Sequence, residues 1–215
     1  MQQVATYSKD YLPYKCVLNR RGRRKYGTIE DLIDNCSSVI STVGTSSGNV
    51  ILQEHRKSIR YSTYLEFFDS DVADYEFVLK GIVPQEKRKY VKWLPRNQQV
   101  DLIKYEAGGF FHEHCDERLD VHHYATLLIF PPATGRFAHT GGRLSVKQSN
   151  GETFVFDSDR NEKWTFIAFQ TNVLHECELV TEGTRVVLKT ELYYSTRRAG
   201  SPLTRNRDYN PILLD

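Results

Sequence analysis

A succession of eight short, strand-prone segments fills the second half of this 215-residue chain and limits the folds that it can adopt. After Pro95 the sequence becomes rich in Val, Ile, Phe, Tyr and Thr, and Gly, Asn and Asp separate one run from the next. Such runs predict strands, here at Val100–Tyr105, Gly109–Asp116, Tyr124–Phe130, Arg143–Lys147, Thr153–Asp157, Trp164–Gln170, Val173–Val180 and Thr184–Tyr194. Eight short strands joined by turns favour two packed sheets, as a sandwich or a jelly roll.

Two turn signals support this interpretation. The sequence AHTGG, which ends at Gly142, directly precedes the predicted strand RLSVKQ. The tripeptide Ser149–Gly151 joins that strand to ETFVFD, which is typical of a β-hairpin.

The predicted fold class is α+β but mainly β, with residues 98–195 as the core, 1–97 as a mixed, partly helical segment packed on it, and 196–215 as a tail. We expect one structural domain overall. A first supporting helix is predicted from Thr28, a suitable N-cap, because apolar residues recur at helical spacing as far as Ile40. A second is predicted from about Ser70, and Pro84 would end it.

Composition argues for a soluble protein of a reducing compartment. The four cysteines show no CxxC spacing and are too sparse for a disulfide framework. The polar N-terminus does not resemble a signal peptide, and no window approaches the ~18 apolar residues of a membrane span. We therefore expect an intracellular protein, cytoplasmic or nuclear, with no membrane association.

Two basic runs interrupt an otherwise balanced charge. The formal net charge is only +2, which excludes a strongly basic nucleic-acid packaging protein. NRRGRRKY nevertheless places five cations between Arg20 and Lys25, and EKRKYVKW places four between Lys87 and Lys92. Most such runs are solvated surface, but these two keep nucleic acid open as a partner.

The segment YEAGGFFHEHCD concentrates potential metal ligands in one predicted strand. Residues two apart in a strand face the same way, so His114 and Asp116 can point at one ion while Cys115 faces the opposite side. A third ligand is available in His175, on a predicted strand 61 residues after His114. Two imidazoles and one carboxylate on one face of an ion suit non-haem Fe(II).

Zinc is an alternative at this level. A closed structural zinc site needs a fourth protein ligand, and Cys177 lies two residues beyond His175. The ligand types therefore leave both metals open.

The wider pattern resembles the prolyl 4-hydroxylase-like branch of the 2-oxoglutarate and Fe(II)-dependent oxygenases. That family has Tyr-x-x-Gly followed by His-x-Asp nine residues after the Tyr, and this chain has Tyr105, Gly108, His114 and Asp116 at those spacings. The resemblance continues through TLLIF, the Gly141–Gly142 pair and IAFQTNVLHECELVTEGTR, and covers roughly residues 98–195.

The resemblance implies a double-stranded β-helix, or jelly-roll, core. It also implies that His114, Asp116 and His175 hold Fe(II), with 2-oxoglutarate and O2 as co-substrates and ascorbate as a stimulant. Arg185 would then pair with the 2-oxoglutarate carboxylate that is remote from the metal, because a guanidinium offers two parallel donors.

For three further residues the sequence leaves more than one role open. Lys189 lies four residues beyond Arg185 on the same nominal strand face and is the second choice for the remote carboxylate. Tyr105 either helps to hold 2-oxoglutarate or is a core tyrosine with a satisfied hydroxyl. Regular alternation would bring His112 to the ligand face, but we expect it at the substrate mouth, unless a bulge alters the register.

The function that this resemblance implies is hydroxylation of a C–H bond, with release of succinate and CO2. A prolyl residue in a peptide or protein is the first candidate substrate. The same chemistry on a nucleic acid or a small molecule is the alternative. A hypothesis of another class is a non-catalytic jelly-roll binding module with a structural metal, which would not need Arg185.

Overall fold

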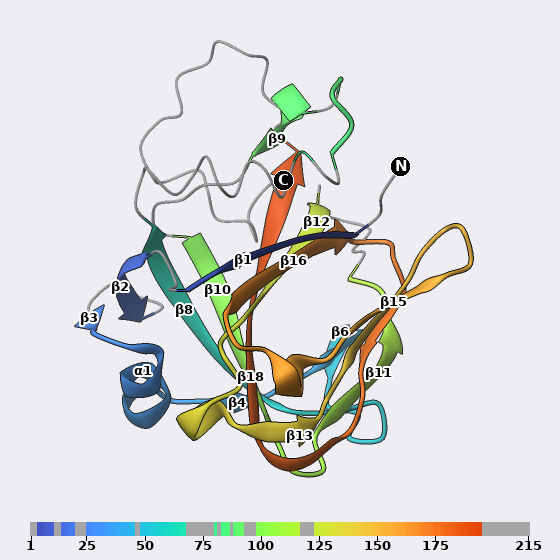
Figure 1. The fold of residues 1–215 in the computed structure, drawn as a ribbon. Helices are drawn as coiled ribbons and strands as arrows, with labels where there is room; N and C mark the ends of the chain where they lie inside the picture. Colours follow the sequence, from blue (N-terminus) through green and yellow to red (C-terminus); the bar gives the residue numbers. More distant parts are fainter. Residues whose placement is uncertain are drawn as a thin grey trace.

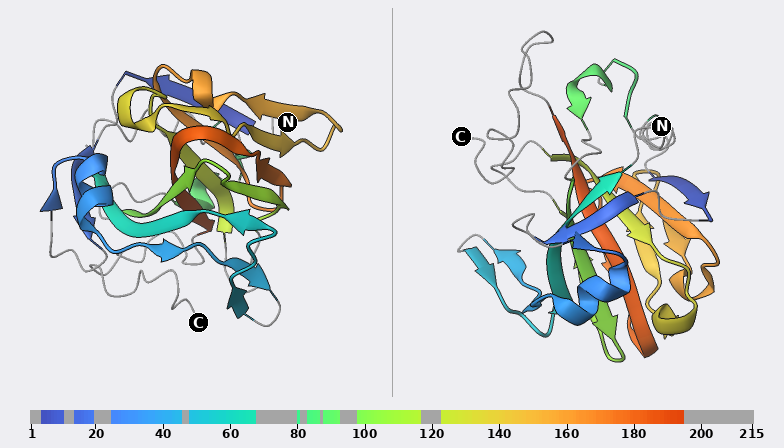
Figure 2. Two further views of the ribbon diagram at one scale, coloured as in Figure 1. Left: turned by 90° about the horizontal axis from the view of Figure 1, so that it is seen from below. Right: turned by 90° about the vertical axis from the view of Figure 1, so that its left-hand side faces the viewer.

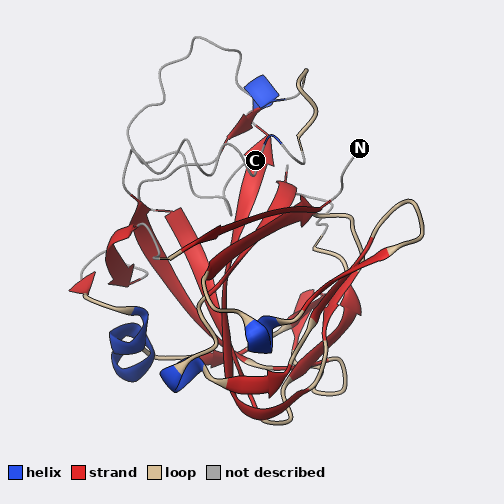
Figure 3. Ribbon diagram, viewed as in Figure 1, coloured by secondary structure: helices blue, strands red, loops and turns tan. Residues whose placement is uncertain are grey.

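The computed structural model describes residues 4–10, 14–19, 25–45, 48–67, 80, 83–86, 88–92, 98–116 and 123–194. Strands dominate these residues (Figure 3). The N-terminal elements are β1 (Val4–Lys9), β2 (Tyr14–Asn19), β3 (Lys25–Tyr26), α1 (Ile29–Asn35), β4 (Val39–Ile40), β5 (Val43–Thr45), β6 (Gly48–Val50), β7 (Arg56–Lys57), β8 (Ile59–Phe67), η2 (Arg88–Tyr90) and β9 (Val91–Lys92).

All eight predicted strands of the second half are present. They are β10 (Gln98–Glu106), β11 (Phe110–His114), β12 (His123–Phe130), β14 (Leu144–Lys147), β15 (Thr153–Phe156), β16 (Trp164–Gln170), β17 (His175–Cys177) and β18 (Val180–Tyr194). Between them lie η3 (Gly135–Phe137), β13 (His139–Gly141) and η4 (Ser158–Arg160). The predicted hairpin is confirmed, since β14 pairs antiparallel with β15 across the turn that contains Gly151.

These eight strands form a jelly roll. One sheet contains the order β16-β12-β18-β10, and the other is β15-β14-β17-β11. Numbered along the chain, the strands pair as 6-3-8-1 and 5-4-7-2, so that the chain passes repeatedly between two facing sheets, which is the jelly-roll arrangement. Figure 1 shows the long strand β18 running beside β10 and β12.

The N-terminal segment adds strands to both sheets. In the larger sheet β1 pairs with β16 and β8 with β10, while β7 pairs with β11 in the smaller one. Figure 2 shows α1 lying outside the strands. Described residues before 98 are therefore mostly strands rather than helices, because the open edges of the jelly roll offer unpaired backbone groups to further strands.

The first predicted helix is confirmed in its first two turns and wrong beyond them. The side chain of Thr28 caps α1 by accepting from the backbone N–H of Asp31. The helix ends at Asn35, and Val39 and Ile40 form β4, where both side chains are about half exposed. Cys36-Ser37-Ser38 separates the two, and serine competes with helical hydrogen bonding. The second predicted helix, apart from residues 80, 83 and 84, lies outside the described residues.

Alternation along the large sheet separates its two faces. In β18, Val186 and Leu188 join the core that α1 covers, whereas Val187 joins the core between the two sheets. Arg185 and Lys189 share the parity of Val187, and both line a cavity between the sheets. Because both faces of the large sheet are buried, the sequences of its strands are nearly continuous apolar runs.

Most of the first basic run and the predicted tail lie outside the described residues. In the second run, Arg88 donates to the backbone carbonyls of Val83 and Lys80, which gives it a local structural role. None of the helices in the described part of the chain has the length and apolar character needed to cross a membrane.

Candidate metal and co-substrate site

A β-bulge in β11 decides which histidine faces the cavity. Phe111 pairs with Cys177 and His114 with His175, so two residues of β11 stand opposite one residue of β17. The extra residue brings Phe111 and His114 to the same face, where their rings stack with centroids 3.4 Å apart.

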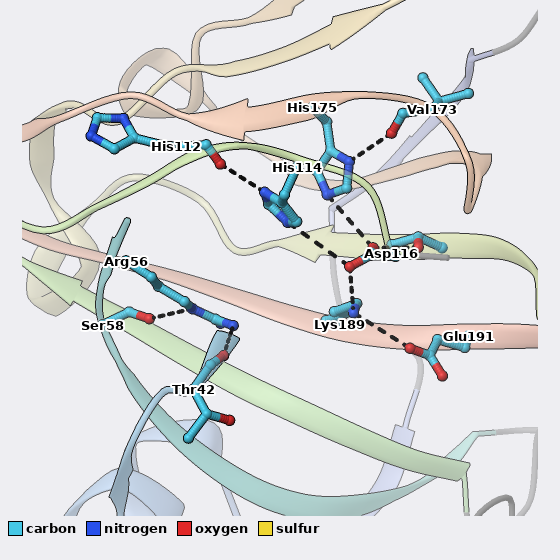
Figure 4. A network of polar contacts seen from close by, with 11 residues as sticks. Thr42, Arg56, Ser58, His112, His114, Asp116, Val173, His175, Lys189 and Glu191 are labelled. Carbon is cyan, nitrogen blue, oxygen red and sulfur yellow. Dashed lines mark hydrogen bonds and ion pairs between the residues drawn. The ribbon is translucent and has the colours of Figure 1, made fainter. Parts of the chain in front are cut away.

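His112 is exposed as a consequence of the bulge. Its ring packs against Phe110, with centroids 4.6 Å apart, and points away from the three ligands (Figure 4). It does not line the cavity. The placement of His112 on the ligand face by regular alternation is therefore wrong, and its part at a substrate mouth stays a prediction.

The three predicted ligands come together. One ligand atom from each of His114, Asp116 and His175 lies within 4.8 Å of the others, and among the described residues this is the cluster that could hold a metal ion. Nε2 of His175 is 3.5 Å from Asp116 Oδ2, and Nε2 of His114 is 3.9 Å from Oδ1 (Figure 4). Adjacent strands β11 and β17 supply the histidines, and Asp116 follows the end of β11.

Both imidazoles are oriented by their own backbone. Nδ1 of His114 lies 2.9 Å from the carbonyl of His112, and Nδ1 of His175 lies 3.0 Å from that of Val173. A carbonyl only accepts, so Nδ1 carries the hydrogen in each ring. Each Nε2 therefore turns a lone pair toward Asp116, which is the tautomer that binds metals.

Burial keeps the two imidazoles uncharged. It lowers the pKa of His114 to about 3, with a further contribution from the neighbouring His175. Burial likewise lowers the pKa of His175, although the Asp116 carboxylate opposes the effect. Neutral imidazole is the form that a metal needs, so both side chains are ready to bind at neutral pH.

Asp116 is held as a carboxylate by several partners. Thr126 donates to Oδ2 at 2.6 Å and Lys189 to Oδ1 at 2.9 Å. Burial alone would raise its pKa, but the positive charge of Lys189, the interactions with His175 and His114 and the Thr126 hydrogen bond outweigh burial and lower it. The backbone N–H of Asp116 donates to the carbonyl of Thr171, which fixes the residue beyond the strand end.

The donor set fits an open metal site better than closed zinc. Cys177, the possible fourth ligand, is not part of the cluster, and its Sγ donates to the carbonyl of Glu178. Three ligands on one side leave coordination positions for a chelating co-substrate.

Arg185 is the most completely buried charged residue near this cluster, with 1% of its surface exposed. Its guanidinium carbon lies 5.0 Å from the ring centre of Tyr105 and 5.1 Å from that of Phe130. Nε donates to Ser158, whereas Nη1 has no hydrogen-bond partner among the described residues. A buried donor without an acceptor is costly, so Nη1 is suited to an anionic ligand.

Lys189 and Tyr105 are both engaged within the protein. Lys189 contacts the carboxylates of Asp116 at 2.9 Å and Glu191 at 3.4 Å. Burial raises the pKa of Tyr105, and the neighbouring Ser58 hydroxyl opposes this effect. Lys189, Asp116 and Tyr105 line one cavity, which has a volume of about 40 Å³ and is partly open to solvent.

The tertiary structure explains why glycine is required at position 142 of the Gly141–Gly142 pair. Gly142 has φ of +69°, and a Cβ there would stand 2.7 Å from Cδ of Arg185. We predict that Gly142→Ala lowers the free energy of unfolding by about 2–4 kcal/mol, from backbone strain and overpacking together. Gly151→Ala is the matched control, because Gly151 has φ of +85° but open space around its Cβ position.

The control should cost only about 1 kcal/mol, the strain of a positive φ alone. Urea denaturation of both variants measures the difference. Equal losses would mean that Arg185 is not packed against Gly142.

Sequence reasoning missed Thr126, Ser158 and the buried residues Arg56 and Ser58. Thr126 was detectable, since it shares the inward parity of Leu128 and Phe130 in β12. The others carry no local signal, because their role depends on strands that pair from distant parts of the chain.

Comparisons with known proteins show a similarity of fold but not of sequence. No family model matches the sequence, and no curated protein matches it. A Pseudomonas putida prolyl-4-hydroxylase has a TM-score of 0.47 at 13% identity, over 73% of this chain and 77% of that one. A Trichoplax adhaerens prolyl hydroxylase, in complex with a hypoxia inducible factor peptide fragment, has 0.48 at 14% identity, over 73% and 70%. An oxidoreductase of the 2OG-Fe(II) oxygenase family from Burkholderia pseudomallei has 0.49 at 15%, over 80% and 81%. These are distant resemblances, and the chemistry proposed below rests on the residues of this chain.

Proposed function

We propose that this chain is an Fe(II)- and 2-oxoglutarate-dependent dioxygenase. The observation that carries the proposal is the shared cavity, which joins an open three-ligand cluster to a buried arginine with a free donor. A redox-active ion needs the open three-ligand cluster, and an anionic co-substrate needs the buried arginine with its free donor. A metal site that served structure alone would gain nothing from the unpaired Nη1 of Arg185.

In this proposal the ligands have separate roles. His114 and His175 bind Fe(II) through Nε2, and Asp116 binds through a carboxylate oxygen that Thr126 and Lys189 hold in place. When bound, Fe(II), 2-oxoglutarate and O2 supply the oxidation: the co-substrate loses CO2 to become succinate, and one oxygen atom enters a C–H bond. Arg185 binds the remote carboxylate of 2-oxoglutarate, with the Tyr105 ring against its guanidinium.

Arg185 is preferred over Lys189 for the remote carboxylate. The Lys189 ammonium already neutralises Asp116, whereas the partner of the Arg185 guanidinium is the neutral Ser158. The two cations therefore differ in their need for an outside anion.

The substrate that we propose is a prolyl residue of a peptide or protein, on the sequence resemblance. His112, exposed on the outer side of β11, would contact the peptide. Nucleic acids and small molecules are the competing substrates.

The test is anaerobic reconstitution with Fe(II) followed by 2-oxoglutarate. We expect the weak visible charge-transfer band of a metal-chelated 2-oxo acid, and succinate on admission of O2 in the presence of ascorbate. An increase in succinate formation on addition of a proline-rich peptide supports a prolyl substrate. Succinate formation that the peptide does not increase favours a nucleic acid or a small molecule instead. Zn(II) is the control, since it has no redox chemistry and should give neither signal.

Absence of the band in protein that binds Fe(II) would overturn the proposal. The chain would then be a metal-stabilised binding module.

A further inference from the structure

A second buried arginine enters the cavity from outside the jelly roll. Arg56 belongs to β7, the short strand that pairs with β11 at the edge of the smaller sheet, where it stands opposite Phe111. It is 9% exposed and lines the same cavity as the three metal-ligand candidates and Arg185.

Neighbouring groups fix the guanidinium of Arg56. Its Nε donates to Ser58 at 3.0 Å and its Nη1 to the carbonyl of Thr42 at 3.2 Å (Figure 4). Its central carbon lies 4.3 Å from the ring centre of Phe111, which in turn stacks on His114. A cation on an aromatic face, tied by two hydrogen bonds, is preorganised for a ligand.

Neither partner of Arg56 is an anion, and no carboxylate among the described residues forms an ion pair with it. Burial of an unpaired guanidinium is costly unless an anion compensates it. Arg185 is in the same situation, because its one partner is a serine. Lys189 differs, since Asp116 neutralises it.

One other carboxylate borders the cavity but does not cancel these charges. Glu176 lies between His175 and Cys177, which both point inward, so its side chain turns to the other face of β17. The cavity therefore presents two uncompensated guanidinium groups, which suits an anionic ligand better than a neutral one.

Both arginines share the cavity with Tyr105, and Arg185 lies over its ring. Arg56, Arg185 and Tyr105 line the same cavity, and Arg56 donates to Ser58 at 3.0 Å. Burial raises the pKa of Tyr105, and the charges of Arg56 and Arg185 both oppose this effect. Arg56 thus shares one cavity with Arg185 and Tyr105.

We propose that Arg56 and Arg185 together bind the remote carboxylate of a dicarboxylic 2-oxo acid. The N-terminal segment would then complete the co-substrate site instead of only supporting the sheet. This inference rests on the proposed function, and it makes Arg56 the residue that selects a dicarboxylate over a monocarboxylate.

The test compares two ligands and three variants. Full-length protein with Fe(II) is titrated anaerobically by calorimetry with 2-oxoglutarate and with 2-oxobutyrate, which keeps the chelating end but lacks the remote carboxylate. Arg56→Gln should weaken 2-oxoglutarate binding about 10-fold or more, the contribution of a charge-assisted hydrogen bond. It should change 2-oxobutyrate binding less than about twofold.

Arg143→Gln is the matched control, because Arg143 is an exposed arginine that pairs with Glu178 outside the cavity. It should bind both ligands as the wild type does. Arg56→Lys keeps the buried charge but loses the planar guanidinium with its paired donors, and it should give an intermediate loss for 2-oxoglutarate.

Unchanged 2-oxoglutarate affinity in both Arg56 variants would overturn the inference. Equal losses for the two ligands would also overturn it, since Arg56 would then act at the chelating end. Failure of the proposed function looks different, because the wild type itself would then not bind 2-oxoglutarate.

Discussion

His114→Ala is expected to lower Fe(II) affinity by at least about 100-fold, whereas His112→Ala should leave it within about twofold. Loss of a group that only orients a ligand costs about 10–100-fold in metal affinity, and loss of a ligand should cost more. The two histidines lie two residues apart in one strand, so the pair tests the bulge in β11 directly.

Anaerobic Fe(II) titration of both variants measures this difference, with circular dichroism to compare their folds. His112 is exposed, and its removal leaves the stack of Phe111 on His114 in place. Comparable losses of iron in the two variants would mean that β11 has a regular register and that the bulge is wrongly placed.

Arg185→Met is expected to weaken 2-oxoglutarate binding by about 100-fold without lowering the stability of the ligand-free protein. Two charge-assisted hydrogen bonds contribute about 3 kcal/mol, and each 1.4 kcal/mol is a factor of ten. Methionine has a similar length but removes a buried charge that has no anionic partner among the described residues. Removal of such a charge is neutral or stabilising.

Lys189→Met, in contrast, is expected to lower the stability of the ligand-free protein. It leaves the buried carboxylate of Asp116 without its closest cation, and loss of one partner of a buried pair costs about 3 kcal/mol or more. Urea denaturation of metal-free protein therefore separates the two cations, and the 2-oxoglutarate titration assigns the remote carboxylate. A large loss of ligand-free stability in Arg185→Met, with 2-oxoglutarate affinity intact, would make Arg185 a structural residue and Lys189 the better candidate.

The sequence alone determined the strands of the core and nominated the residues of the candidate site. Alternating and continuous apolar runs predicted all eight strands, because burial on one or both faces of a sheet leaves its period in the sequence. The same parity placed Arg185 and Lys189 on one face of β18. Three potential ligands of two residue types, in two separate segments of the chain, were sufficient to nominate His114, Asp116 and His175.

Three features were decided only by the tertiary structure. The bulge in β11 arises from its pairing with β17, and it turns His112 outward. The pairing of Lys189 with a carboxylate depends on Asp116, which is adjacent to Lys189 in space but 73 residues away in the chain. Arg56 reaches the cavity because β7 pairs with β11. Local periodicity records which face a side chain takes, whereas strand register and partners across the sheet follow from long-range pairing, which leaves no periodic trace in the sequence.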